Sequence, residues 1–234
     1  MIYVFNRSNE VIHIMADLST MHNDVLTEQL NGEYSYEFTV ALKDVEANKL
    51  EEFNKIGFYK DGDFKLFTIR EIIDEKSDYG LRTVYCEHDF YNLIDNIVED
   101  KRVVDGDARQ AVEKAIFGSD WQVGEVEDFG NKNINFYYSD SKTNLANVVD
   151  TYGGELRFRI LLDEHGECIA GKYVDLLHSR GKETGVRFEF GRNLESVTRE
   201  VSVMELKTAM IGRGKAPETE NDGHSRRILF DEVV

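Results

Sequence analysis

Hydrophobic and polar residues alternate along much of the first third of the chain. The clearest case is 33–40, where Tyr34, Tyr36, Phe38 and Val40 alternate with polar residues. Because successive side chains of a strand point to opposite faces of a sheet, this pattern predicts a half-buried strand. The same pattern, with Asn, Asp, Ser and Gly at the turns, predicts further strands of an antiparallel meander at 2–5, 11–15, 25–30, 56–60, 64–73 and 81–86.

The period changes to that of a helix in the middle of the chain. Asp44 and the pair His88–Asp89 stand where a helix cap is expected, just before apolar positions at helical spacing. Asp107 is predicted to cap another helix, and the cluster Ser139-Asp140-Ser141 one whose apolar stripe ends at Gly153-Gly154. Helices are therefore expected to concentrate between the two strand-rich ends.

From Glu155 the period returns to two. A strand is predicted over 155–162, followed by a turn and a second strand over 167–174. The stretch 212–225 has the composition of a loop, and only a short apolar patch at 228–230 follows it. Because three residues cannot close a domain, we expect the chain to continue into something longer. Later strands are predicted at 187–190, 194–203 and 206–211.

The charge balance excludes several classes of protein. The chain has 28 basic and 45 acidic residues among 234, a net charge of −17, which disfavours binding to nucleic-acid phosphates and to anionic membranes. No stretch reaches the roughly 18 consecutive apolar residues of a membrane-spanning helix, and no basic leader precedes the first strand. We expect a soluble, unsecreted globular protein that does not insert into a membrane.

Cysteine and histidine spacing gives no metal site. Cys86 and Cys168 lie far apart, so neither a disulfide framework nor a zinc site is indicated, and both thiols are expected to be free and buried. None of the histidines has the spacing of a zinc hydrolase helix. The six histidines are His13, His22, His88, His165, His178 and His224.

The candidate catalytic groups each have a structural explanation that we prefer. His88 with Asp89 is the most attractive pair, but its position favours helix capping or packing. His165 is expected in an exposed turn, and 212–215, Gly-Arg-Gly-Lys, as a plain glycine-rich turn without a phosphate ligand. We therefore assign no catalytic, cofactor-binding or metal-binding residue.

Trp121 is followed by three carboxylates that could line a sugar cleft. We favour a packed indole beside a solvated loop, because pairs of acidic residues occur at many spacings in so acidic a chain. The three carboxylates are those of Glu125, Glu127 and Asp128.

Five segments, in chain order, carry a family resemblance. The most extensive is VYCEHDFYNLIDNIVED at 84–100. The others are LNGEYSYEF at 30–38, YGGELRF at 152–158, FGRNLESVT at 190–198 and TAMIGRGK at 208–215. Together they resemble the phage minor structural protein and prophage endopeptidase tail family, over most of the chain.

The resemblance implies an α+β, mostly β fold. Residues 1–98 with 190–211 would form a barrel-like antiparallel β tube domain of a tail hub. Residues 99–189 would form an inserted, smaller α+β domain, and 212–234 a mobile loop and the start of a further domain.

The resemblance also implies a function. The chain would be a structural subunit of a phage or prophage tail tip, the baseplate hub, assembled in the bacterial host cytoplasm. It would form a homotrimeric ring around the tail channel, contact the distal tail protein and the tape-measure protein, and anchor carboxy-terminal lytic or receptor-binding parts. DNA would pass an acidic channel wall without binding, although the acidity is equally explained by solubility. Enzymatic activity is not expected here, since any endopeptidase would lie in a carboxy-terminal region.

Two alternatives stay open. One is a cell-wall peptidase or glycosidase, a tail-associated lysin, which the family name and the abundant carboxylates favour. The other is a carbohydrate-binding module in which Trp121, Tyr137 and Tyr138 stack on sugar rings, although we expect these aromatic residues in the core of the inserted domain.

Overall fold

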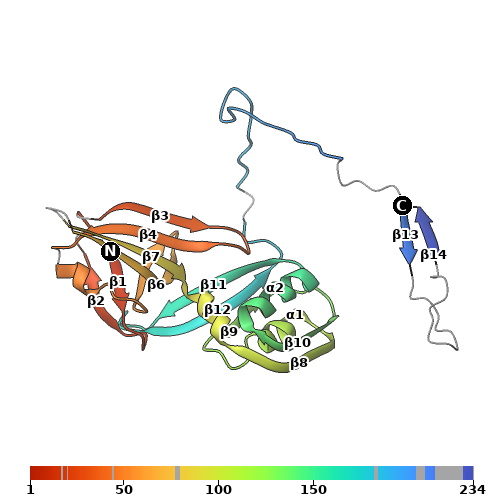
Figure 1. The fold of residues 1–234 in the computed structure, drawn as a ribbon, viewed down its shortest axis with the longest axis horizontal. Coiled ribbons are helices and arrows are strands. Elements are labelled where there is room, and N and C mark those ends of the chain that lie inside the picture. The colour runs from red at the N-terminus through yellow and green to blue at the C-terminus, as the bar shows by residue number, and fades with distance from the viewer. Residues whose placement is uncertain are drawn as a thin grey trace, which may run out of the picture. The chain divides into compact units, whose positions relative to one another are not determined.

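The chain divides into two compact units, Met1–Lys182 and Glu183–Val234. The computed structural model drawn in Figure 1 describes residues 1–16, 18–19, 21–43, 45–76, 80–181, 184–203, 209–213 and 229–233. No helix in these ranges is both long and apolar enough to cross a membrane.

A mixed sheet of ten strands forms most of the first unit. Its order is β2-β1-β5-β6-β11-β12-β9, and β7, β4 and β3 continue from the other end of β6. All neighbours are antiparallel except β9 and β12, which are parallel. The strands are β1 (Ile2–Phe5), β2 (Val11–Met15), β3 (His22–Glu28), β4 (Tyr34–Ala41), β5 (Lys55–Lys60), β6 (Asp63–Glu75), β7 (Leu81–His88), β9 (Gln122–Val126), β11 (Glu155–Leu162) and β12 (Ile169–Leu177).

The long strand β6 is the reason that the sheet curls. Its first half pairs with β5 and its second half with β7, and the register shifts between Ile69 and Glu71, where Arg70 is the extra residue of a bulge. At the far edge, the start of β2 meets the β11–β12 turn, because the Val11 amide donates to the Glu167 carbonyl at 2.8 Å. The sheet is therefore a half-barrel, and the mostly β fold is confirmed.

Two helices and two strands form a second layer in the same unit. β8 (Ile97–Gly106) pairs with β10 (Lys132–Asp140), while α1 (Ala108–Ala115) packs on β8 and α2 (Ser141–Tyr152) packs on β10 (Figure 1). The predicted caps are confirmed: Asp107 accepts from the Gln110 amide, and Asp140 accepts from the Thr143 amide. Gly153, with φ of 85°, ends α2 as predicted.

The helix predicted after His88 is shorter than expected. Residues Asp89–Asp95 form a 3₁₀ helix, η2, and β8 begins at Ile97, which had been assigned to the helical stripe. The cause is Asn96, whose side-chain amide donates to the Phe117 carbonyl at 3.0 Å and to the Ser141 hydroxyl at 2.7 Å. The first predicted helix is likewise a 3₁₀ helix, η1 (Val45–Lys49), and its predicted cap Asp44 lies outside the described residues.

The predicted domain division stays a prediction, and the pairing of two strands bears on it. Strands β11 and β12 fall in the predicted insertion at 99–189. In the main sheet β11 pairs with β6 and with β12. The grouping of 190–211 with 1–98 stays a prediction.

The second unit contains fewer strands than predicted in its described part. Residues 184–203 are mostly exposed and contain a turn at 191–193 and a bridge between Phe190 and Leu194. They form no strand, so the strands predicted at 187–190 and 194–203 are wrong. In this unit β13 (Ala209–Arg213) pairs with β14 (Leu229–Val233), which matches part of the strand predicted at 206–211 and the apolar patch at 228–230.

Candidate functional site

His88 ends β7 and caps η2. Its Nδ1 accepts a hydrogen bond from the Phe90 amide at 3.3 Å, which confirms the predicted capping role. The ring is fully buried and stacks on Tyr34, with the centroids 4.4 Å apart and the planes 6° from parallel. Its Nε2 is buried without a hydrogen-bond partner in the described part of the chain. Burial lowers the pKa of His88 to about 3, so the imidazole is neutral at physiological pH.

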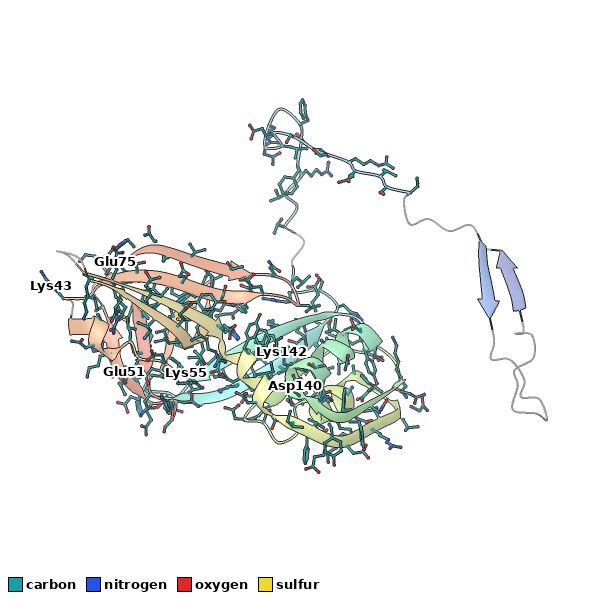
Figure 2. The ribbon with its side chains drawn as sticks, viewed as in Figure 1. Lys43, Glu51, Lys55, Glu75, Asp140 and Lys142 are labelled. Carbon is teal, nitrogen blue, oxygen red and sulfur yellow. The ribbon has the colours of Figure 1, made fainter. Side chains whose placement is uncertain are left out.

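Asp89 is the centre of a buried charge cluster. Its Oδ1 lies 2.8 Å from the Lys55 ammonium, and its Oδ2 lies 2.5 Å from the Lys172 ammonium. Asn92 and Thr68 also donate to Oδ1, at 2.9 Å and 3.2 Å. Lys55 comes from β5 and Lys172 from β12, so the cluster joins two strands that are not neighbours in the sheet (Lys55 is labelled in Figure 2).

Burial and ion pairing act in opposite directions on the pKa values of this cluster. Burial would raise the pKa of Asp89, but the two lysines lower it to about 2. Burial lowers the pKa of Lys55, whereas the neighbouring carboxylates outweigh burial at Lys172 and raise its pKa. Lys172 also contacts the exposed Asp120 at 2.6 Å. Because each charge lies against an opposite charge, the cluster is an ion network that joins these strands.

Trp121 is a packed indole, as predicted. Its ring is buried and meets Phe158 edge to face, with centroids 5.5 Å apart. The Lys172 ammonium lies 5.7 Å from the indole centroid, which links the indole to the charge cluster. The ring faces are therefore covered and cannot stack on a sugar.

The three carboxylates that follow Trp121 are held by local contacts. Glu125 pairs with Arg157 at 3.0 Å, and Asp128 accepts from the Gly130 amide at 2.9 Å. Glu127 accepts from the His178 amide. These contacts do not arrange the carboxylates around a cleft.

Asp175 belongs to a second buried ion network that we did not predict. Its Oδ2 lies 2.7 Å from Arg157 Nε and 2.5 Å from Arg159 Nε, and its Oδ1 accepts from the Glu125 amide at 2.7 Å. A Cβ at Gly124 would lie 1.9 Å from Asp175 Oδ1, so only glycine fits there. Arg157 and Arg159 lie on one face of the strand predicted over 155–162, and Asp175 follows the next predicted strand. This arrangement could have indicated an ion network between the two strands.

A pocket of about 330 Å³ is lined by Phe90, the residue next to Asp89 of the buried charge cluster. It lies where the β3–β4 turn, η2, α2 and β11 meet, and its wall includes Phe90 and Phe158, stacked with centroids 4.3 Å apart. Lys142 and Arg180 stand at its rim, with Lys142 near the start of α2 in Figure 2. Asp150 also lines the pocket and Arg180 already pairs with Glu28, so the lining combines an apolar wall with charges of both signs. Sequence reasoning missed it because its residues come from separate elements.

The predictions of exposure and burial are confirmed at His165 and Cys86 but not at Cys168. His165 is exposed in a turn, and Cys86 is buried, as expected, with burial raising the pKa of its thiol. Cys168 is only half-buried, so the prediction of burial is wrong for this thiol. It lies at the end of a turn, where its carbonyl accepts a hydrogen bond from the Asp163 amide. Gly212 and Arg213 lie in β13, and residues 214–215 are outside the described ranges.

No metal centre is found among the described residues. No group of three or more His, Cys, Asp or Glu side chains in those ranges could hold a metal ion. His13 and His22 lie on separate strands, β2 and β3, and position 224 is outside the described residues.

Tyr137 and Tyr138 do not lie in the core, so that expectation is wrong. Their side chains are 65% and 64% exposed, although Phe136 beside them is fully buried.

Comparison with known proteins shows the fold. No protein-family profile and no curated protein sequence matches the chain. The crystal structure of prophage tail protein gp18 from Listeria monocytogenes EGD-e is similar over 98% of this chain and 66% of its own, with a TM-score of 0.58 and 18% identity. The prophage MuSo2 43 kDa tail protein from Shewanella oneidensis is similar over 100% and 68%, with a TM-score of 0.52 and 12% identity. The chain spans about two thirds of either protein and has the fold of these prophage tail proteins.

Proposed function

We propose that this chain is a structural subunit of a phage or prophage tail, placed at the tail tip as part of the baseplate hub. The observation that carries the proposal is the similarity of fold to prophage tail protein gp18 over 98% of the chain. The buried titratable groups support it, because His88 and Asp89 serve packing and ion pairing. The same groups give no support to a peptidase or glycosidase.

A ring of identical subunits requires two different surfaces that meet head to tail. β2 and β3 are the candidate edges, because in the described residues β2 pairs as a strand with β1 and β3 with β4. The start of β2 already contacts the β11–β12 turn, which leaves the rest of its edge for a neighbour. Ile14 on β2 and Val25 on β3 are exposed. We place the β2 edge of one copy against the β3 edge of the next, in a homotrimer around the tail channel.

Ile14→Lys is expected to convert the trimer into a monomer, because each contact would then bury an unpaired ammonium. Light scattering after size exclusion measures the mass, which should be three times 27.0 kDa for the unchanged chain and 27.0 kDa for the variant. Val104→Lys, at an exposed residue of β8, is the matched control and should stay trimeric. A monomeric unchanged chain, or a trimeric Ile14→Lys variant, would contradict the ring.

The channel wall is proposed to be acidic enough that DNA passes without binding. The net charge of −17 offers phosphates few cationic partners that could release counterions. Labelled duplex DNA should therefore show no change in fluorescence anisotropy with the trimer at low salt. A binding curve that weakens steeply as salt rises would show cationic contacts and overturn this part of the proposal.

The proposed partners follow from the position at the tail tip. The distal tail protein and the tape-measure protein would contact the ring, and carboxy-terminal lytic or receptor-binding parts would be anchored to it. Co-elution of the trimer with a distal tail protein from the same particle tests this, and separate elution at micromolar concentrations counts against it.

A further inference from the structure

The outer face of the β8–β10 sheet is uncovered in the described part of the chain. The helices α1 and α2 pack on the other face, where Val98, Val103 and Phe136 are buried. Ile97 and Tyr137 are exposed, which is unusual for residues of this size on a sheet that already has one covered face. Exposed apolar residues that gather in one place indicate a binding surface.

Tyr138 adds to this surface through an unusual backbone. Neighbouring strand residues point to opposite faces, so Tyr138 should point toward the helices as Phe136 does. Instead its φ is 45°, a left-handed value that bulky residues rarely adopt, and its side chain is as exposed as that of Tyr137. The two rings stand at 90° with centroids 4.9 Å apart. Such strain persists where the surrounding structure imposes it, often at binding sites.

The two tyrosines border a hollow of about 440 Å³. Phe117 and Ile97 supply further apolar surface, and the Lys101 ammonium lies 3.8 Å from the centroid of the Phe117 ring. The polar side chains around the hollow are those of Asn96, Glu99 and Asp100. The size falls within the range of small-molecule sites, on the order of 300–1,000 Å³.

The charges around the hollow limit the ligand. Glu99 and Asp100 outnumber Lys101 in the lining, although Asp100 also pairs with Arg102 at 3.4 Å, and the net charge of the chain adds to the repulsion of an anion. A quaternary ammonium group needs several free ring faces, but Lys101 already occupies the face of Phe117. A neutral sugar meets neither obstacle. The C–H groups on one side of a pyranose ring can lie on the electron-rich face of a tyrosine, and its hydroxyls can donate to carboxylates.

We propose that this hollow binds a neutral oligosaccharide. One pyranose ring stacks on Tyr137 or Tyr138, and the other tyrosine ring, which is perpendicular to the first, borders the side of the site. Glu99 and Asp100 accept hydrogen bonds from sugar hydroxyls. The site is independent of the proposed ring, because it uses neither β2 nor β3.

Saturation-transfer NMR with the full chain tests the proposal, with the neutral tetrasaccharides of N-acetylglucosamine and of glucose as probes. At least one tetrasaccharide should show transfer, and sialyllactose and phosphocholine should show none. Tyr137→Ala and Tyr138→Gly should weaken the tetrasaccharide at least tenfold. Tyr59→Ala, at a similarly exposed tyrosine of β5, should leave the affinity unchanged.

A melting curve separates a binding role of Tyr138 from a structural one. Glycine tolerates the left-handed backbone, so Tyr138→Gly should melt at the same or a higher temperature than the unchanged chain. Three results would overturn the proposal: no transfer to either tetrasaccharide, equal transfer in the tyrosine variants, or a lower assembly mass of those variants, which would make the face a contact between copies.

Discussion

Asp89→Asn is expected to destabilise the fold by about 3–5 kcal/mol, the usual cost of leaving a buried ion without its partner. The substitution keeps the size of the side chain, removes the charge and replaces one acceptor oxygen by an NH2 donor. Lys172 would still have Asp120 at 2.6 Å, but Lys55 would keep only the Asn9 amide oxygen, at 2.7 Å. The loss should therefore come mainly from the buried Lys55 ammonium.

Urea unfolding of three variants measures this effect. Asp120→Asn removes the other carboxylate on Lys172, and because Asp120 is 62% exposed the cost should be at most about 1 kcal/mol. The double variant Asp89→Asn/Lys55→Met removes the unpaired ammonium as well, and should recover part of the lost stability. Equal costs for Asp89→Asn and Asp120→Asn would show that burial of the ion pair is not what matters.

His88 is expected to make the fold sensitive to mild acid. The folded-state pKa of about 3 lies below the ordinary value of 6.5, so below pH 6.5 the unfolded chain binds a proton that the folded chain excludes. The contribution of His88 is fully present above pH 6.5 and is lost as the pH falls toward 3. At about 1.4 kcal/mol per pH unit, it should remove about 2 kcal/mol by pH 5.

The measurement is the slope of unfolding free energy against pH between 7 and 5. His88→Asn keeps an acceptor for the Phe90 amide but cannot titrate, so this variant should be less stable overall and have a shallower slope. His165→Asn changes an exposed histidine and should keep the original slope. Asp89 does not interfere, because its own contribution is lost only below about pH 3.8. An unchanged slope in His88→Asn would refute the assignment.

The sequence predicted the elements that are determined by neighbouring residues. The alternation over 33–40 gave β4, and the side chains of Asp107 and Asp140 gave the starts of α1 and α2. The helix after His88 was too long in our prediction because Asn96 ends it through Phe117 and Ser141, which are distant in sequence. The place of β11 and β12 in the main sheet depends equally on long-range pairing with β6.

The same limit applies to the candidate sites. The position of His88 and Asp89 before apolar residues was enough to predict capping, but nothing near them indicated Lys55 or Lys172. Tyr137 and Tyr138 were expected in the core of the inserted domain, but both are exposed, and Tyr138 has a positive φ. A sequence pattern could show that aromatic residues are present there, but not which face they occupy.

The charge cluster also bears on how the chain is made. A ribosome releases β5 and η2 long before β12, so Lys55 and Asp89 emerge while Lys172 is still to be translated. Until then Asp89 has one of its two lysines, and neither β9 nor β11 has β12 beside it. The amino-terminal strands thus gain their last long-range contacts only when synthesis has passed β12, and a prematurely ended chain lacks the residue that completes its interior.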